Sequence, residues 1–161
     1  MKFSSEELID RWPSVRYFVL IGSLCVVAGG MVAAVTGPLD LHDGSWLAAY
    51  LVLVGGVAQI GLGLGQSALA QVVPDPKLIH RELLSWNLGN GVVVIGSLIG
   101  SAILTSVGGL ILAVALWSFL TGVRLIRASA PGVLLVVYRG LATFVLLSIP
   151  VGLAMSWIRH A

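Results

Sequence analysis

"YFVLIGSLCVVAGGMVAAVT", residues 17–36, is a run without a single charged side chain. About 20 mostly apolar residues are what an α-helix needs to cross the hydrocarbon core of a bilayer. Four further apolar runs follow, separated by short connections, and of these only residues 107–126 contain a charged side chain, Arg124. The predicted membrane spans are residues 17–36, 46–72, 84–104, 107–126 and 140–158.

The composition points to the same class. Apolar residues make up 58% of the 161 residues and charged residues 10%, against about 25% charged residues in a typical soluble domain. The seven acidic residues all lie outside the predicted spans, as the cost of placing a charge in lipid requires. We therefore expect an all-α, polytopic membrane bundle of five helices at 17–161, with no soluble domain and with the lipid bilayer as its surroundings.

Lysine and arginine residues lie almost entirely on one side of this topology. Eight of the nine precede the first span, fall between spans two and three, or fall between the last turn of span four and the start of span five, and Arg159 alone lies on the other side. Cytoplasmic loops carry such an excess. We therefore predict a multi-pass protein of the cytoplasmic (inner) cell membrane, with the N-terminus inside and the C-terminus outside. Because these cations follow the topology and form no separate patch, we expect no nucleic-acid partner.

Two stretches beside the spans call for an interpretation. Residues 1–16 are predicted to form a cytoplasmic interfacial segment, in which Leu8 and Trp12 share one face of a short helix that Pro13 ends. "PGVLLVVY", residues 131–138, precedes the fifth span. It is either a half-buried or re-entrant piece, or an early turn of a tilted fifth helix.

Spans two and three carry polar side chains that lipid cannot satisfy. In each span these side chains recur at helical spacing and share one face. Gly96 and Gly100 add a GxxxG pattern, which lets another helix backbone approach closely. Trp86 is predicted to lie in the interfacial aromatic belt. The polar candidates are Gln59, Gln66, Asn87, Asn90, Ser97 and Ser101.

Two functions fit this pattern. The first is a non-catalytic accessory or assembly subunit of a membrane complex, or a homo-oligomer, which acts through glycine-rich helix packing and hydrogen bonds between helices. Its partner would be another integral membrane protein or a second copy. The alternative is a small transporter or channel-like protein whose polar stripe lines a path for a small neutral solute.

The residues offer no pattern typical of an enzyme. The three histidines lie at the edges of the predicted spans, and Cys25 is the single cysteine. A haem within a helix bundle usually needs a histidine or methionine ligand at depth, and no catalytic triad or HExxH motif is present. We expect no catalytic residues, no metal, no cofactor and no enzymatic activity.

Three stretches carry a resemblance to a known group. "WLAAYLVLVGGVAQIGLG" (46–63), "WNLGNGVVVIGSLIG" (86–100) and "VGGLILAVALWSFLTGVRLIR" (107–127) resemble helix pairs of small bacterial membrane proteins of the haem–copper-oxidase-like group. The resemblance covers residues 46–127 and implies a shared helical scaffold. The haem and copper chemistry of that group depends on helix-borne histidines, which spans two to four lack, so no ligand role is transferred.

Overall fold

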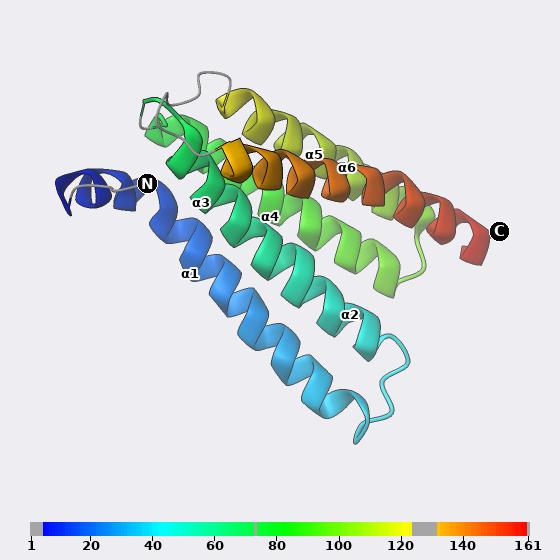
Figure 1. Cartoon of the computed structure of the whole chain (residues 1–161). Coiled ribbons are helices and arrows are strands. Elements are labelled where there is room, and N and C mark those ends of the chain that lie inside the picture. The colour runs from blue at the N-terminus through cyan, green and yellow to red at the C-terminus, as the bar shows by residue number, and fades with distance from the viewer. Residues whose placement is uncertain (1–4, 73, 124–131, 161) are drawn as a thin grey trace.

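The computed structural model describes residues 5–72, 74–123 and 132–160, and these residues are mostly helical. Figure 1 shows the helices packed into one bundle. In chain order, the helices are α1 (Ser5–Thr36), α2 (Gly44–Tyr50), the π-helical segment η1 (Leu51–Ala58), α3 (Gln59–Leu69), α4 (Pro76–Leu98), α5 (Ala102–Gly122) and α6 (Gly132–His160).

Within the described ranges, four helical stretches are long and apolar enough to cross a membrane. They are Asp10–Thr36, Gly44–Leu69, Ala102–Gly122 and Gly132–Gly152, the second of which joins α2, η1 and α3 into one rod. The chain thus has the helices of an integral membrane protein. The third predicted span is not in this set, because α4 carries several charged side chains in its first turns and its apolar part runs only from residue 83 to residue 98.

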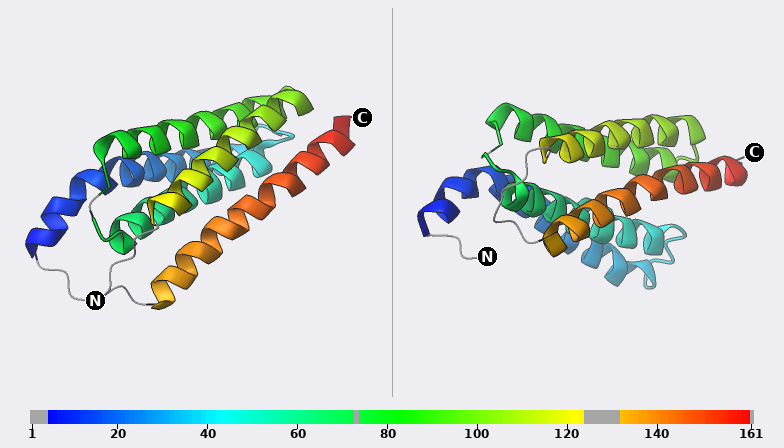
Figure 2. Two further views of the ribbon diagram at one scale, coloured as in Figure 1. Left: turned by 90° about the horizontal axis from the view of Figure 1, so that it is seen from above. Right: turned by 45° about the horizontal axis from the view of Figure 1, so that its top comes forward.

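Two helical hairpins and a last helix make up the bundle. The first hairpin is α1 against the α2–η1–α3 rod, and the second is α4 against α5. Helix α6 lies along α3 and α5 and so contacts both hairpins (Figures 1 and 2). The connections 37–43 and 99–101 lie at one end of the bundle, and the connection 70–75 between α3 and α4 lies at the other. We refer to these as the α1–α2 end and the α3–α4 end.

The turn between α4 and α5 differs from the prediction. The outer connection was expected around 105–106, but α4 ends at Leu98 and α5 begins at Ala102. Gly100 has a φ of 70°, a conformation that glycine adopts without steric cost. Gly100 therefore lies outside the helix, and it does not form a helical GxxxG pair with Gly96.

The start of α4 also differs from the prediction. Asp75 accepts a hydrogen bond from the backbone N–H of Lys77 (2.8 Å), and Pro76 is the first helical residue. An aspartate cap followed by proline is a strong helix start. Helix α4 therefore begins eight residues before the predicted span at 84, and Glu82 lies within its second turn.

The first and last helices are longer than expected. Pro13 was predicted to end an interfacial helix, but α1 runs through it from Ser5 to Thr36. Pro13 lies in the third turn of α1, where a proline removes one backbone hydrogen bond and kinks a helix, and Figure 1 shows the first turns bent away from the rest of α1. Residues 132–138 are the first turns of α6 itself, so the re-entrant alternative is wrong for these residues.

An aromatic cluster forms the centre of the core. Phe18 of α1, Trp86 of α4 and Phe119 of α5 are at most 1% exposed. The Phe119 ring lies 5.6 Å from that of Phe18 and 6.0 Å from that of Trp86, both in edge-to-face geometry, which is favourable for aromatic pairs. The expectation that Trp86 belongs to an interfacial belt is wrong, because its side chain points into the bundle.

The side chain of Arg11 joins α1 to the C-terminal end of α3 by hydrogen bonds. The Arg11 guanidinium donates hydrogen bonds to the carbonyl oxygens of Ser67 and Ala70, which belong to the last turn of α3. Carbonyl groups at a helix C-terminus have no partner within the helix and carry partial negative charge. The adjacent Ser14 hydroxyl lies 3.2 Å from that of Ser67.

Candidate functional sites

Glu82 is the most unusual side chain in the described part of the chain. It is 0% exposed, although glutamate is almost never fully buried without a partner of opposite charge. The Gln66 side-chain amide donates to its Oε1 oxygen at 3.0 Å. Its Oε2 oxygen has no hydrogen-bond partner among the described residues. One half of the carboxyl is thus satisfied from α3, and the other half lies in apolar surroundings.

Three helices besides α4 close around this carboxyl. At Gly122 of α5, an added Cβ would lie 2.4 Å from Gln66 Nε2 and 3.5 Å from Glu82 Oε1. On α6, buried Tyr138 donates its hydroxyl to the Phe119 carbonyl at 2.9 Å. A side chain larger than hydrogen at position 122 would therefore displace the Gln66 amide from the carboxyl.

Burial changes the proton affinity of Glu82, which lies outside the four membrane-spanning stretches. The loss of water around the carboxyl raises its pKa to about 7, and the hydrogen bond from Gln66 acts in the opposite direction. Desolvation disfavours the charged form of a carboxylic acid. Glu82 is therefore able to gain or lose a proton near neutral pH.

Polar side chains continue along the same contact into the bundle. The Tyr50 hydroxyl, at the end of α2, donates to Asn90 Oδ1 on α4 at 2.7 Å. Gln59 shares a helix face with Gln66, seven residues away, and is 0% exposed. Neither of its amide atoms has a partner among the described residues, nor does Trp86 Nε1. The polar side chains along this contact are Tyr50, Gln59, Gln66, Glu82, Trp86 and Asn90.

The structure brings only some of the predicted polar residues into contacts between helices. Gln66 and Asn90 each bond to another helix, to a carboxyl and to a phenol respectively. The Asn87 amide donates only to the Leu83 carbonyl of its own helix. Ser101 caps the start of α5, accepting from the Leu104 N–H at 3.3 Å. The hydrogen bonds of Gln66 and Asn90 to another helix each join the α2–η1–α3 rod to α4 through one amide side chain, and the partner is a carboxyl or a phenol instead of a second amide.

Gly96 contributes to the internal packing of the second hairpin. An added Cβ at Gly96 would lie 2.6 Å from the backbone N of Thr105 on α5. Ser97, one residue further along α4, is half-buried, and its carbonyl accepts the N–H of Gly100 in the turn. Both residues therefore lie where the α4–α5 hairpin closes.

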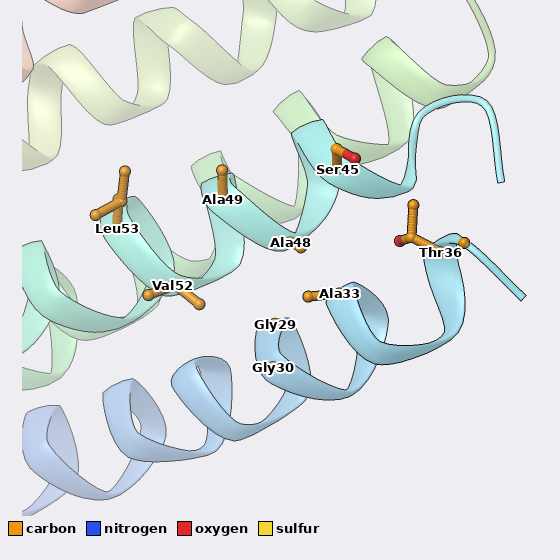
Figure 3. A pocket seen from close by; sticks show the side chains of 10 residues that line it. Gly29, Gly30, Ala33, Thr36, Ser45, Ala48, Ala49, Val52 and Leu53 are labelled. Atoms are coloured by element: carbon orange, nitrogen blue, oxygen red, sulfur yellow. The ribbon is translucent and has the colours of Figure 1, made fainter.

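A groove opens at the opposite end of the molecule, between α1 and the α2–η1 rod (Figure 3). Its volume is about 610 Å³. Ala48 and Val52 lie on the side of their helix that faces α1, across from Gly29 and Ala33. Most of the lining is glycine or alanine. The lining residues are Gly29, Gly30, Ala33, Thr36, Gly37, Ser45, Ala48, Ala49, Val52 and Leu53.

Sequence reasoning missed both Glu82 and the groove. Glu82 was placed in a connection, yet the sequence Asp75–Pro76 marks an earlier helix start. From that start, Glu82, Trp86 and Asn90 follow at intervals of four and share one helix face. The groove had no comparable signal, because small residues occur in most helices of this chain.

The comparisons add no relatives. No family model matches the chain, and neither a curated protein nor a solved structure does. The resemblance to the haem–copper-oxidase-like group stays a prediction. Within 5–72, 74–123 and 132–160, no group of three or more His, Cys, Asp or Glu residues is placed to hold a metal ion.

Proposed function

We propose that the protein is an integral membrane protein that assembles with a transmembrane helix through the α1–α2 groove. The helix belongs to another membrane protein, for which this chain is an accessory subunit, or to a second copy of the chain. The observation that carries the proposal is the groove itself, whose floor is built from glycine and alanine between two apolar helices.

The chain's own contacts show how such a surface is used. At Gly22 an added Cβ would lie 3.0 Å from the Gly56 carbonyl oxygen, and at Gly108 it would lie 2.6 Å from the backbone N of Val93. Small residues permit this close approach of helices, which drives association within a bilayer. At Gly30, in contrast, no atom lies within 4 Å of an added Cβ. Gly30 therefore offers a close-approach surface that no helix in the described part of the chain occupies.

The membrane topology supports the same function. Helix α4 runs beside α5, to which a short turn joins it, so we propose that α4 is the fifth crossing, with its apolar part at 83–98 inside the bilayer. With this topology, the positive-inside rule predicts that the groove lies in the outer half of the membrane.

The transporter alternative would need an open path along the polar stripe. Gln59 and Gln66 are at most 2% exposed, which favours assembly over transport.

The test compares two glycines that both face open space. Gly30→Leu places a side chain in the groove, and Gly140→Leu places the same side chain on α6, where an added Cβ also meets no atom within 4 Å. Leucine has a higher helix propensity than glycine, so neither change disturbs its helix. Each tagged full-length variant is extracted gently from its own membrane and weighed by native mass spectrometry.

We expect the wild-type chain and Gly140→Leu to retain a protein partner or a second copy at fixed stoichiometry, and Gly30→Leu to lose it. A wild-type chain that is recovered only as a monomer contradicts the proposal. So does a Gly30→Leu variant whose complex is the same as that of the wild type. The mass of the retained partner distinguishes a homo-oligomer from an accessory subunit.

A further inference from the structure

We propose that Glu82 is a reversible proton-binding site whose neutral carboxyl keeps the α3–α4 end of the bundle closed and whose ionisation opens that end to water. On ionisation, the O–H bond of the carboxylic acid breaks, the electron pair stays on the carboxylate, and the proton passes to water. This inference is independent of the groove and of any partner that the groove binds.

The geometry fits a neutral carboxylic acid. Glu82 Oε1 accepts from the Gln66 amide, so it serves as the carbonyl oxygen, and the proton belongs on Oε2. Oε2 is enclosed and has no donor among the described residues to stabilise a negative charge. An ionised carboxylate in this position would leave a buried charge with one hydrogen bond, which is costly.

Among the described residues, the charged groups on the surrounding helices do not neutralise Glu82. From α1, Arg11 is engaged by the carbonyl oxygens of Ser67 and Ala70. Helix α5 contains no charged residue, and α6 presents buried Tyr138. Among the residues that the structure describes, Glu82 takes part in no salt bridge. Exposed cations or titratable groups on α4 and α6 are Lys77, His80, Arg81 and Arg139.

The proton affinity that follows from this burial lies in the physiological range. Desolvation raises the pKa of Glu82 from the ordinary value of 4.5 to about 7. The carboxyl thus changes its charge when the pH on its side of the membrane crosses neutrality. Arg124 and Arg127 lie outside the described residues; an ion pair with either one would instead hold the midpoint at or below the ordinary value.

Ionisation has a structural consequence because four helices meet at this carboxyl. The enclosed carboxylate needs water on Oε2, and water enters only if α3, α4, α5 or α6 moves apart at this end. Ile79, which lies on α4 three residues before Glu82 and shares its helix face, is 5% exposed. The accessibility of position 79 is therefore a direct measure of the opening.

The first experiment follows the proton. Glu6, Glu7 and Glu82 are the only glutamates of the chain. In the full-length Glu6→Gln, Glu7→Gln variant, glutamate labelled with ¹³C at its carboxyl carbon makes Glu82 the single labelled carboxylic acid. Its chemical shift is followed in lipid nanodiscs from about pH 4 to about pH 9, which brackets the ordinary glutamate value. We expect a midpoint near 7.

The second experiment follows the opening. Ile79→Cys is made in a Cys25→Ala background, and its labelling rate with N-ethylmaleimide is divided by that of Gln71→Cys, an exposed position in the same background. This ratio removes the intrinsic pH dependence of thiol chemistry. We expect the ratio to rise several-fold between pH 6 and pH 8 with Glu82 present, and to stay constant in Glu82→Gln.

Each outcome decides the proposal. A midpoint near 7 together with a pH-dependent ratio supports it. A carboxyl that titrates at its ordinary value or stays in one state over the whole range contradicts it. A ratio that does not depend on pH, or that depends equally on pH in Glu82→Gln, contradicts the opening. The titration needs no change at position 82, so it remains decisive even if Glu82→Gln does not fold.

Discussion

The two hairpins of this protein are built from similar residues but pack differently. In the α4–α5 hairpin, Gly96 and Gly108 each lie against backbone of the opposite helix. In the α1–α2 hairpin, Gly29 lies against Val52 and the Ala48 carbonyl, whereas neighbouring Gly30 meets nothing. The α4–α5 hairpin therefore uses Gly96 and Gly108 for its own packing, whereas the α1–α2 hairpin leaves Gly30 open beside the groove. Glycine content alone does not tell an internal contact from an external one.

The largest expected effect is at the closed hairpin. Gly108→Leu would place its Cβ 2.6 Å from the backbone N of Val93, and a backbone atom yields only if the helices separate. Overpacking costs typically about 1–3 kcal/mol where side chains are able to adjust, and here the cost is larger. We expect no monodisperse protein on size-exclusion chromatography in detergent.

The control for this change is Gly91→Leu, on α4, the other helix of the same hairpin. An added Cβ at Gly91 meets no atom within 4 Å, so this variant should elute as the wild type does. Similar loss of both variants would mean that the hairpin tolerates a leucine at neither position, and the distinction between closed and open surfaces would not hold.

The next effect concerns the face of α4 that carries the buried carboxyl of Glu82. A carboxyl whose folded-state pKa is raised stabilises the fold most when both states are protonated. The advantage is lost as the pH rises from the ordinary value of 4.5 through the folded value of about 7. The change is on the order of 3 kcal/mol. We expect the thermal unfolding midpoint in detergent to fall over this pH range.

Glu82→Gln removes the titrating group while it keeps the shape of the side chain. Its unfolding midpoint should therefore vary less between pH 4.5 and pH 7. If the wild type and Glu82→Gln lose stability in parallel, other groups carry the pH dependence and the buried carboxyl does not contribute.

The smallest effect sharpens the comparison within α1. Gly29→Ala would bring its Cβ to 2.8 Å from the Ala48 carbonyl oxygen and should destabilise the fold by about 1–3 kcal/mol. Gly30→Ala meets open space and should stabilise α1 by up to about 1 kcal/mol through helix propensity. Unfolding midpoints of the two variants, measured side by side, check this difference of sign between neighbours.

The class of fold was predictable because hydrocarbon imposes long apolar runs on the sequence. The positions of the turns were not. The α4–α5 turn at 99–101 contains no charge and lies within a predicted span. Hydropathy does not distinguish a turn made of apolar residues from a continuing helix, and the φ of Gly100 depends on tertiary packing. The predicted spans three and four therefore both begin several residues too late.

The candidate sites were predictable only in part, for a related reason. Gln66 and Asn90 stand out in apolar spans, and both take part in contacts between helices. Their partners, Glu82 and Tyr50, are unremarkable in the sequence because they lie near span ends, where polar side chains usually face water. Only the three-dimensional packing shows that the end of α4 is enclosed.

The attachment of Arg11 to the end of α3 bears on the order of events during synthesis. Arg11 emerges from the ribosome more than fifty residues before its acceptors, the carbonyls of Ser67 and Ala70. In the topology predicted from the charge distribution, the charge of Arg11 until then favours the N-terminus at the cytoplasmic face. Once α3 is complete, the same cation binds the carbonyl groups at its C-terminal end and holds the first hairpin together. The predicted topology thus gives one side chain two successive roles, first as a topology signal and later as a structural contact.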